Sequence, residues 1–142
     1  MAGYACDSPP GPCELIEALG GELEIFVGDG LAYGDAHVQW YEDGWAVLLH
    51  GGLPLPIASM ALARGIVRWY ARAFHAPVPE PPDRLAAAIL IPRVAALLAV
   101  VAYDGDVQAV ARAFVVPIPV AAQRMRGIAH VPAQSGEYLR VR

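Results

Sequence analysis

The stretch HVQWYEDGWAVLLH, residues 37–50, decides the fold of this chain. Polar and apolar residues alternate over 37–41, and the acidic residues and glycine of 42–44 are typical of a tight turn. The apolar run 45–50 completes a β-hairpin with the strand before the turn. An earlier alternating stretch, 22–27, predicts a further strand. We therefore expect a small antiparallel sheet.

Helical patterns surround this sheet. Residues 14–19 carry apolar positions at helical spacing and stop at Gly20-Gly21. From 57 to 74, apolar residues recur at steps of three and four, and arginines recur every four residues at 64, 68 and 72. This segment predicts a helix with an arginine stripe. An α+β fold follows, with the sheet packed against a helical layer.

The rest of the chain alternates between proline-rich connections and apolar helices. Residues 75–82 contain four prolines and predict an extended connection. We expect helices over 83–91, 92–103, 107–114 and about 120–128, with Asp83 and Asp106 as N-caps. In domain terms, residues 1–13 predict a flexible segment, 14–130 a single domain with a helix-turn-helix-like hairpin over 106–128, and 131–142 a tail.

Composition excludes several classes of protein. With 56% hydrophobic and 17% charged residues among 142, the chain is not intrinsically disordered. The net charge of −4 argues against direct binding to nucleic acid. All ten basic residues are arginines, which excludes lysine Schiff-base and P-loop chemistry. Cys6 and Cys13 are too few for a disulfide framework, so we expect a reduced, cytoplasmic protein. The apolar span 85–103 is broken by Pro92-Arg93 and predicts no membrane helix.

Two segments resemble a known family. Residues 83–92, DRLAAAILIP, look like the pattern A-[ND]-x-F-A-A-x-L-L-M-P of the ImmA/IrrE family of zinc metallopeptidase-like proteins. Residues 105–125 resemble that family's downstream helical segment. The similarity covers roughly residues 14–128. It implies a zincin-like fold with a C-terminal helical hairpin and, as partners, phage-type or stress-response helix-turn-helix repressors that active bacterial members cleave.

The family's first signature, F-x-L-A-H-E-x-x-H, corresponds to residues 60–68, MALARGIVR. The two histidine positions fall at Arg64 and Arg68, and the glutamate position falls at Gly65. A permanently protonated guanidinium has no lone pair for zinc, and glycine cannot take a proton from water. The resemblance therefore implies a pseudoenzyme, with no catalytic residue, no metal ligand and no cofactor. The third ligand would fall near Pro79, beside Glu80.

Two hypotheses stay open for the arginines of this degenerate site. One hypothesis pairs Arg64 and Arg68 with Glu80 or Asp83, so that arginine charge replaces metal charge. The other leaves an arginine stripe facing solvent.

The resemblance also implies a function, which is stated here as an expectation. The chain would bind and regulate a protein partner, such as a repressor or another phage or mobile-element protein, without cutting it. Two alternatives stay open: an active metallohydrolase whose site is rebuilt from His75, Glu80 and Asp83, and a structural subunit of a larger phage or mobile-element assembly, which self-association as a homo-oligomer would favour. A DNA-reading role for Arg124 and Arg126 competes with a helical hairpin that covers the preceding helix.

Overall fold

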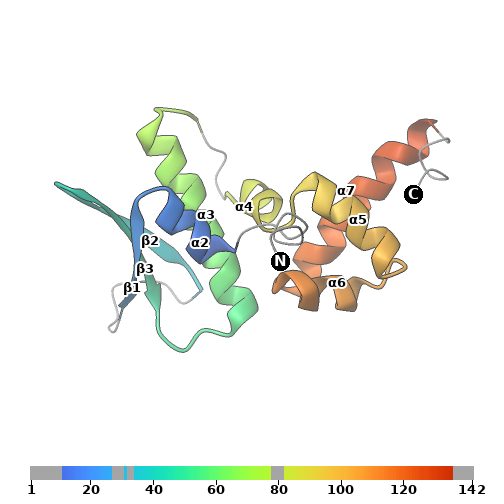
Figure 1. Ribbon diagram of the computed structural model, residues 1–142, viewed down its shortest axis with the longest axis horizontal. Coiled ribbons are helices and arrows are strands. Elements are labelled where there is room, and N and C mark those ends of the chain that lie inside the picture. The colour runs from blue at the N-terminus through green and yellow to red at the C-terminus, as the bar shows by residue number, and fades with distance from the viewer. Residues whose placement is uncertain (1–10, 27–30, 32–33, 78–81, 136–142) are drawn as a thin grey trace, which may run out of the picture. The chain divides into compact units, whose positions relative to one another are not determined.

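The computed structural model describes residues 11–26, 31, 34–77 and 82–135. These residues divide into two compact units, one made of the described residues up to 90 and the other of residues 91–135. The first holds a three-stranded sheet with helices α2, α3 and α4, and the second holds helices α5, α6 and α7 (Figure 1). The predicted α+β class is confirmed. The expectation of a single domain over 14–130 stays a prediction.

The sheet contains β1 (Gly21–Phe26), β2 (Ala36–Tyr41) and β3 (Gly44–His50) in the order β1-β3-β2. The hairpin is confirmed, since β2 and β3 are antiparallel with Tyr41 opposite Gly44. The expected all-antiparallel sheet is wrong, because β1 pairs with β3 in parallel. Alternation in a sequence assigns residues to faces but does not choose neighbouring strands. The most apolar strand, β3, takes the centre, and β2 is left at an edge.

Helices in the first unit follow the predicted segments closely. Helix α2 spans Pro12–Ala18, α3 spans Leu55–Ala73 and α4 spans Asp83–Leu90. Helix α2 ends at glycine as predicted, since Gly20 has φ +83°. One detail is wrong: Asp83 is the first residue of α4 and its carboxylate binds an arginine, so it is not an N-cap.

The second unit contains α5 (Arg93–Ala102), α6 (Val107–Phe114) and α7 (Ile118–Ser135). Asp106 caps α6 as predicted, accepting from the N–H groups of Gln108 and Ala109. The predicted last helix, 120–128, is too short at both ends, and the predicted tail begins inside it. The predicted start at 120 lies too late because a proline usually interrupts a helix. Pro119 lies in the first turn of α7, where the missing N–H of proline would have no partner within the helix.

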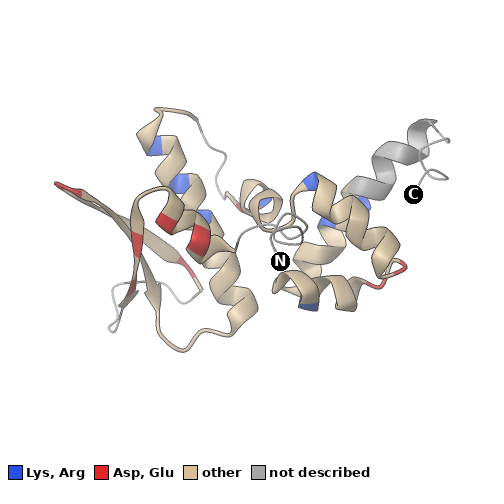
Figure 2. Ribbon diagram, in the orientation of Figure 1, with Lys and Arg blue, Asp and Glu red and all other residues tan. Residues whose placement is uncertain are grey.

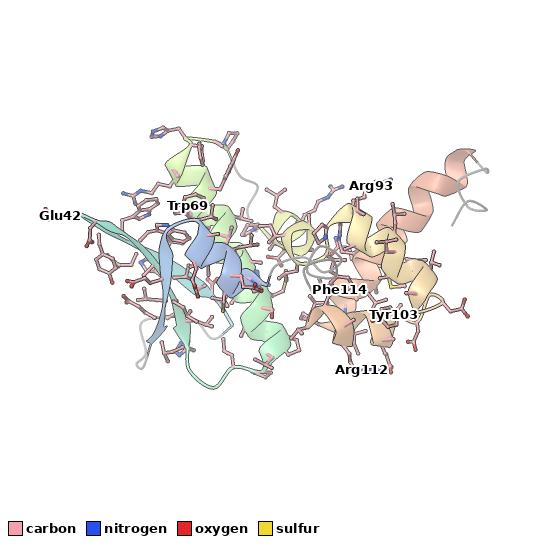
Figure 3. All side chains as sticks on the ribbon, in the orientation of Figure 1. Glu42, Trp69, Arg93, Tyr103, Arg112 and Phe114 are labelled. Atoms are coloured by element: carbon pink, nitrogen blue, oxygen red, sulfur yellow. The ribbon has the colours of Figure 1, made fainter. Side chains whose placement is uncertain are left out.

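The core of the first unit forms where α2 and α3 cover one face of the sheet. Trp45 is 5% exposed; its indole stacks on Trp69 at a centroid distance of 4.9 Å, and its Nε1 donates to the carbonyl of Leu19 at 3.1 Å. Figure 3 shows Trp69 on the side of α3 that faces the sheet. The Trp45 ring also lies against the backbone at residue 21, where an added Cβ would come within 2.6 Å of it. Glycine at 21 is therefore a packing requirement of Trp45 as well as a helix stop signal.

The core of the second unit is made of small apolar side chains. Helix α7 packs against α5 and α6, which agrees with the helical-hairpin alternative. Arg124 on α7 donates from Nε to the carbonyl of Ile91 at 3.0 Å, and burial lowers the pKa of its guanidinium. This half-buried arginine is hydrogen-bonded within its own unit. Buried residues here include Ile91, Ala96, Ala99, Val110, Val116 and Ala121.

Among the described residues, no single helix is long and apolar enough to cross a membrane, and only the broken pair α4 and α5 meets that test together by length and composition.

Val115, which ends α6, has φ +55°, a left-handed conformation that β-branched residues avoid. Glycine adopts this conformation without steric cost, whereas alanine keeps the strain. Both replacements remove the same valine packing. We therefore expect Val115→Gly to be more stable than Val115→Ala by about 1 kcal/mol in urea unfolding, the reverse of the usual order in helical segments. Equal stability of the two variants would contradict this assignment of strain.

Candidate functional site

The candidate site lies on the arginine-bearing face of α3. Arg64, Arg68 and Arg72 are spaced by four residues, and basic positions recur along this helix in Figure 2. The side chains of Arg64 and Arg68 are 22% and 30% exposed, and both donate to carbonyls of the segment 34–36. The predicted one-turn spacing therefore puts these two guanidinium groups on one face. Of the three arginines, only Arg72 is exposed, as the hypothesis of a solvent-facing stripe predicts.

Arg64 joins α3 to α4. Its Nε and Nη2 donate to Oδ1 and Oδ2 of Asp83 at 2.8 and 3.4 Å, a two-point pairing of guanidinium and carboxylate. Its Nη1 donates to the carbonyl of Gly34 at 3.1 Å. Asp83 opens α4, where the helix dipole also favours a negative charge. The pairing of Arg64 with Asp83 was one of the predicted possibilities and is present.

Arg68 pairs with a residue that sequence reasoning missed. Its Nη1 donates to Oδ1 of Asp35 at 2.9 Å and to the carbonyl of Ala36 at 3.1 Å. Among the described residues, Arg68 therefore pairs with Asp35 and not with the expected Asp83. The other expected partner, Glu80, lies outside the described residues, so that pairing stays a prediction. Asp35 precedes β2 in a glycine-rich stretch that shows neither helical nor strand periodicity. The one indication of its role is that two partly buried arginines need two carboxylates.

The pKa of Asp35 reflects this pairing. Partial burial raises the pKa of the carboxyl, but the hydrogen bonds from Arg68 and from the N–H of Ala36, with the charges of Arg68 and Arg64, outweigh burial and hold the pKa below its usual value. The carboxylate is therefore ionised at neutral pH. It anchors α3 to the start of β2.

Gly65 lies where α3 comes closest to the sheet. A Cβ at this position would be 3.0 Å from Cγ1 of Val47 and 3.8 Å from the Cβ of Ala36. The residue is buried and its neighbours are apolar, so there is no room for a glutamate. The position that the resemblance assigns to a general base is a helix–sheet packing contact.

The residues do not fit a zinc ion. Within the described part of the chain, no group of three or more histidine, cysteine, aspartate or glutamate residues could hold a metal. His75 is exposed at φ +50° after α3, and Asp83 is engaged by Arg64. The alternative metal site predicted from His75, Glu80 and Asp83 is only partly described, because Glu80 lies outside the described residues. His50 contacts the carbonyl of Leu31 through Nε2.

A groove lies beside the two ion pairs. It has a volume of about 370 Å³ and is lined from β2 by Ala36, Val38 and Trp40 and from α3 by Arg68 and Arg72. The guanidinium of Arg72 lies 4.9 Å from the ring centroid of Trp40, a cation–π contact. Leu31, Asp35 and His37 complete the lining, so the groove combines apolar side chains with charged and polar ones.

No family model, no curated protein and no solved structure matches this chain.

The packing role of Gly65 is tested by introducing a glutamate at this position. We expect Gly65→Glu to lower the free energy of unfolding by about 3 kcal/mol, because it forces a carboxylate between α3 and the sheet. Gly127→Glu is the matched control, since a Cβ at Gly127 meets nothing within 4 Å. Urea unfolding of both variants checks this; a Gly65→Glu protein as stable as the control would refute the packing role.

The Asp35 pair predicts a pH dependence. Because the folded pKa lies below the unfolded value, the pair stabilises the fold above about pH 4, and this stabilisation is lost as the pH falls through the folded pKa. The Asp35 side chain is 40% exposed, so solvent screening keeps the effect small. We expect Asp35→Asn to cost about 0.5–1 kcal/mol at pH 7 and nothing at pH 2.

The control for Asp35→Asn is Asp104→Asn, an exposed position at φ +52° that asparagine tolerates. Chemical unfolding from pH 7 to pH 2 compares the two variants with the parent. A cost for Asp35→Asn that persists unchanged at pH 2 would mean that the carboxylate's charge is not what stabilises the fold.

Proposed function

We propose that this chain is a catalytically inactive, metallopeptidase-like protein of the ImmA/IrrE type that binds and regulates a protein partner without cutting it. The observation that carries the proposal is the occupation of the two histidine-equivalent positions by arginines whose guanidinium groups are held by carboxylates, Arg64 by Asp83 and Arg68 by Asp35. The resemblance supplies the family and the class of partner, a transcriptional repressor of phage or stress-response type.

The chemistry of these positions supports an inactive site. A guanidinium offers five donors and no acceptor, so neither arginine can ligate a cation. Each arginine bridges α3 to another segment: Arg64 to α4 and to Gly34, and Arg68 to Asp35 and Ala36. In this proposal the ion pairs do the structural work that a metal does in an active relative, since they hold separate elements together through charge.

The glycine between them supports the same conclusion. Activation of a metal-bound water needs a carboxylate near the metal. Gly65 faces Val47 and Ala36 at close range, so the position serves the packing of α3 on the sheet.

Zinc binding tests the proposal. We expect the purified, untagged protein to hold no stoichiometric zinc by elemental mass spectrometry, and to give no saturable heat on titration with zinc at pH 7. Stoichiometric, tight zinc would overturn it. If that zinc were lost in His75→Ala and kept in His37→Ala, the rebuilt site would be assigned instead.

The regulatory part of the proposal is tested by identifying the protein partner. We expect cross-linking in cells, followed by mass spectrometry, to recover a helix-turn-helix repressor whose chain is intact and whose DNA binding changes when the purified chain is added. A repressor cleaved by the chain would contradict the inactive assignment. A repressor whose DNA binding is unaffected would contradict regulation.

A further inference from the structure

Among the described strands, β2 pairs with another strand along one edge only, and residues of β2 line the groove. β2 lies at one end of the strand order, so only one side of it pairs with β3. In an antiparallel strand, the N–H and C=O of alternate residues point to opposite sides. The N–H of Ala36 bonds to Asp35 and its C=O to Arg68, so both groups point away from β3. The alternation then points the N–H and C=O of Val38 outward as well.

Along the outward edge of β2, the backbone groups of Ala36 are hydrogen-bonded, whereas those of Val38 have no partner among the described residues. The ion pair of Arg68 and Asp35 occupies both backbone groups of Ala36. The carbonyl of Trp40 has a long contact of 3.4 Å from the side-chain amide of Gln39. Within the described part of the chain, the N–H and C=O of Val38 have no partner on this side. An exposed edge of this kind is a template for another strand.

Arg72 supplies charge at the open end. Its guanidinium lies over Trp40, which orients it, and no described carboxylate pairs with it. Arg68 beside it is neutralised by Asp35, so the rim of the groove keeps one net positive charge from this helix face. A stacked guanidinium keeps its N–H edges available for a carboxylate.

We propose that the groove between β2 and α3 takes an extended segment of a protein partner, which pairs with the edge of β2 at Val38 and places an aspartate or glutamate side chain on Arg72. The apolar side chains of Val38 and Trp40 receive the neighbouring residues of that segment. This inference rests on the proposed function, because it names the chemistry of the partner that such a protein binds.

Selection from a phage-displayed library of random octapeptides tests it on the full chain. We expect Asp or Glu to be enriched at one fixed position among the peptides selected on the parent protein, and not among those selected on Arg72→Gln. The matched control is Arg84→Gln, an exposed arginine on α4 outside the groove, which should select the same acidic peptides as the parent. Failure to enrich any peptide, or an acidic preference that survives Arg72→Gln, would overturn the proposal.

Fluorescence anisotropy then measures the best selected peptide. We expect replacement of its acidic residue by the amide to weaken binding about tenfold on the parent and on Arg84→Gln, and to change it less than twofold on Arg72→Gln. N-methylation along one backbone edge of the peptide should abolish binding, and along the other edge should leave it intact. Tolerance of methylation on both edges would exclude strand pairing.

Two further outcomes separate this inference from its alternatives. A single-stranded oligonucleotide that displaces the peptide, and whose own binding is lost in Arg72→Gln, would assign the groove to nucleic acid and overturn the inference. Mass spectrometry of the peptide after incubation tests the proposed function independently. Cleavage would contradict an inactive protein, whereas loss of the acidic preference without cleavage contradicts only the docking chemistry.

Discussion

The close approach of α3 to the sheet at Gly65 is the constraint on which the rest of the site depends. Because residue 65 has no side chain, α3 lies against Val47 and Ala36 at van der Waals distance. The flanking arginines are thereby brought within reach of the chain that leads into β2. Both guanidinium groups donate to carbonyls of that segment, at Gly34 and Ala36. A side chain at 65 would press on Val47, whose Cγ1 would lie 3.0 Å from the added Cβ.

The arginines turn this packing into a connected structure. Partly buried cations are stable only when hydrogen bonds and opposite charge compensate their desolvation. Here one carboxylate comes from α4 and the other from the residue before β2, so three elements of the first unit meet at one helix face. The same arrangement explains how two partly buried arginines can lie one turn apart on a helix: they join the elements through ion pairs.

Local sequence patterns predicted parts of both units, and their failures have physical causes. The hairpin, α3 and the α6 cap were predictable because each rests on residues adjacent in sequence. The parallel pairing of β1 was not, since period-two alternation carries no information about which strand becomes the neighbour. Asp35 was missed for a related reason: its partner Arg68 lies 33 residues away, and no local rule connects them.

By itself, the sequence determined the α+β class and the arginine spacing on α3, and it places no metal-ligating side chain at Arg64, Gly65 or Arg68, because these points follow from residue type and helical periodicity. Only the tertiary structure decided which carboxylate each arginine meets, that Gly65 is a packing contact, and that β2 lies at an edge beside a groove. Those facts depend on segments distant in the chain coming together, and the free energy of their packing is not encoded in any single stretch.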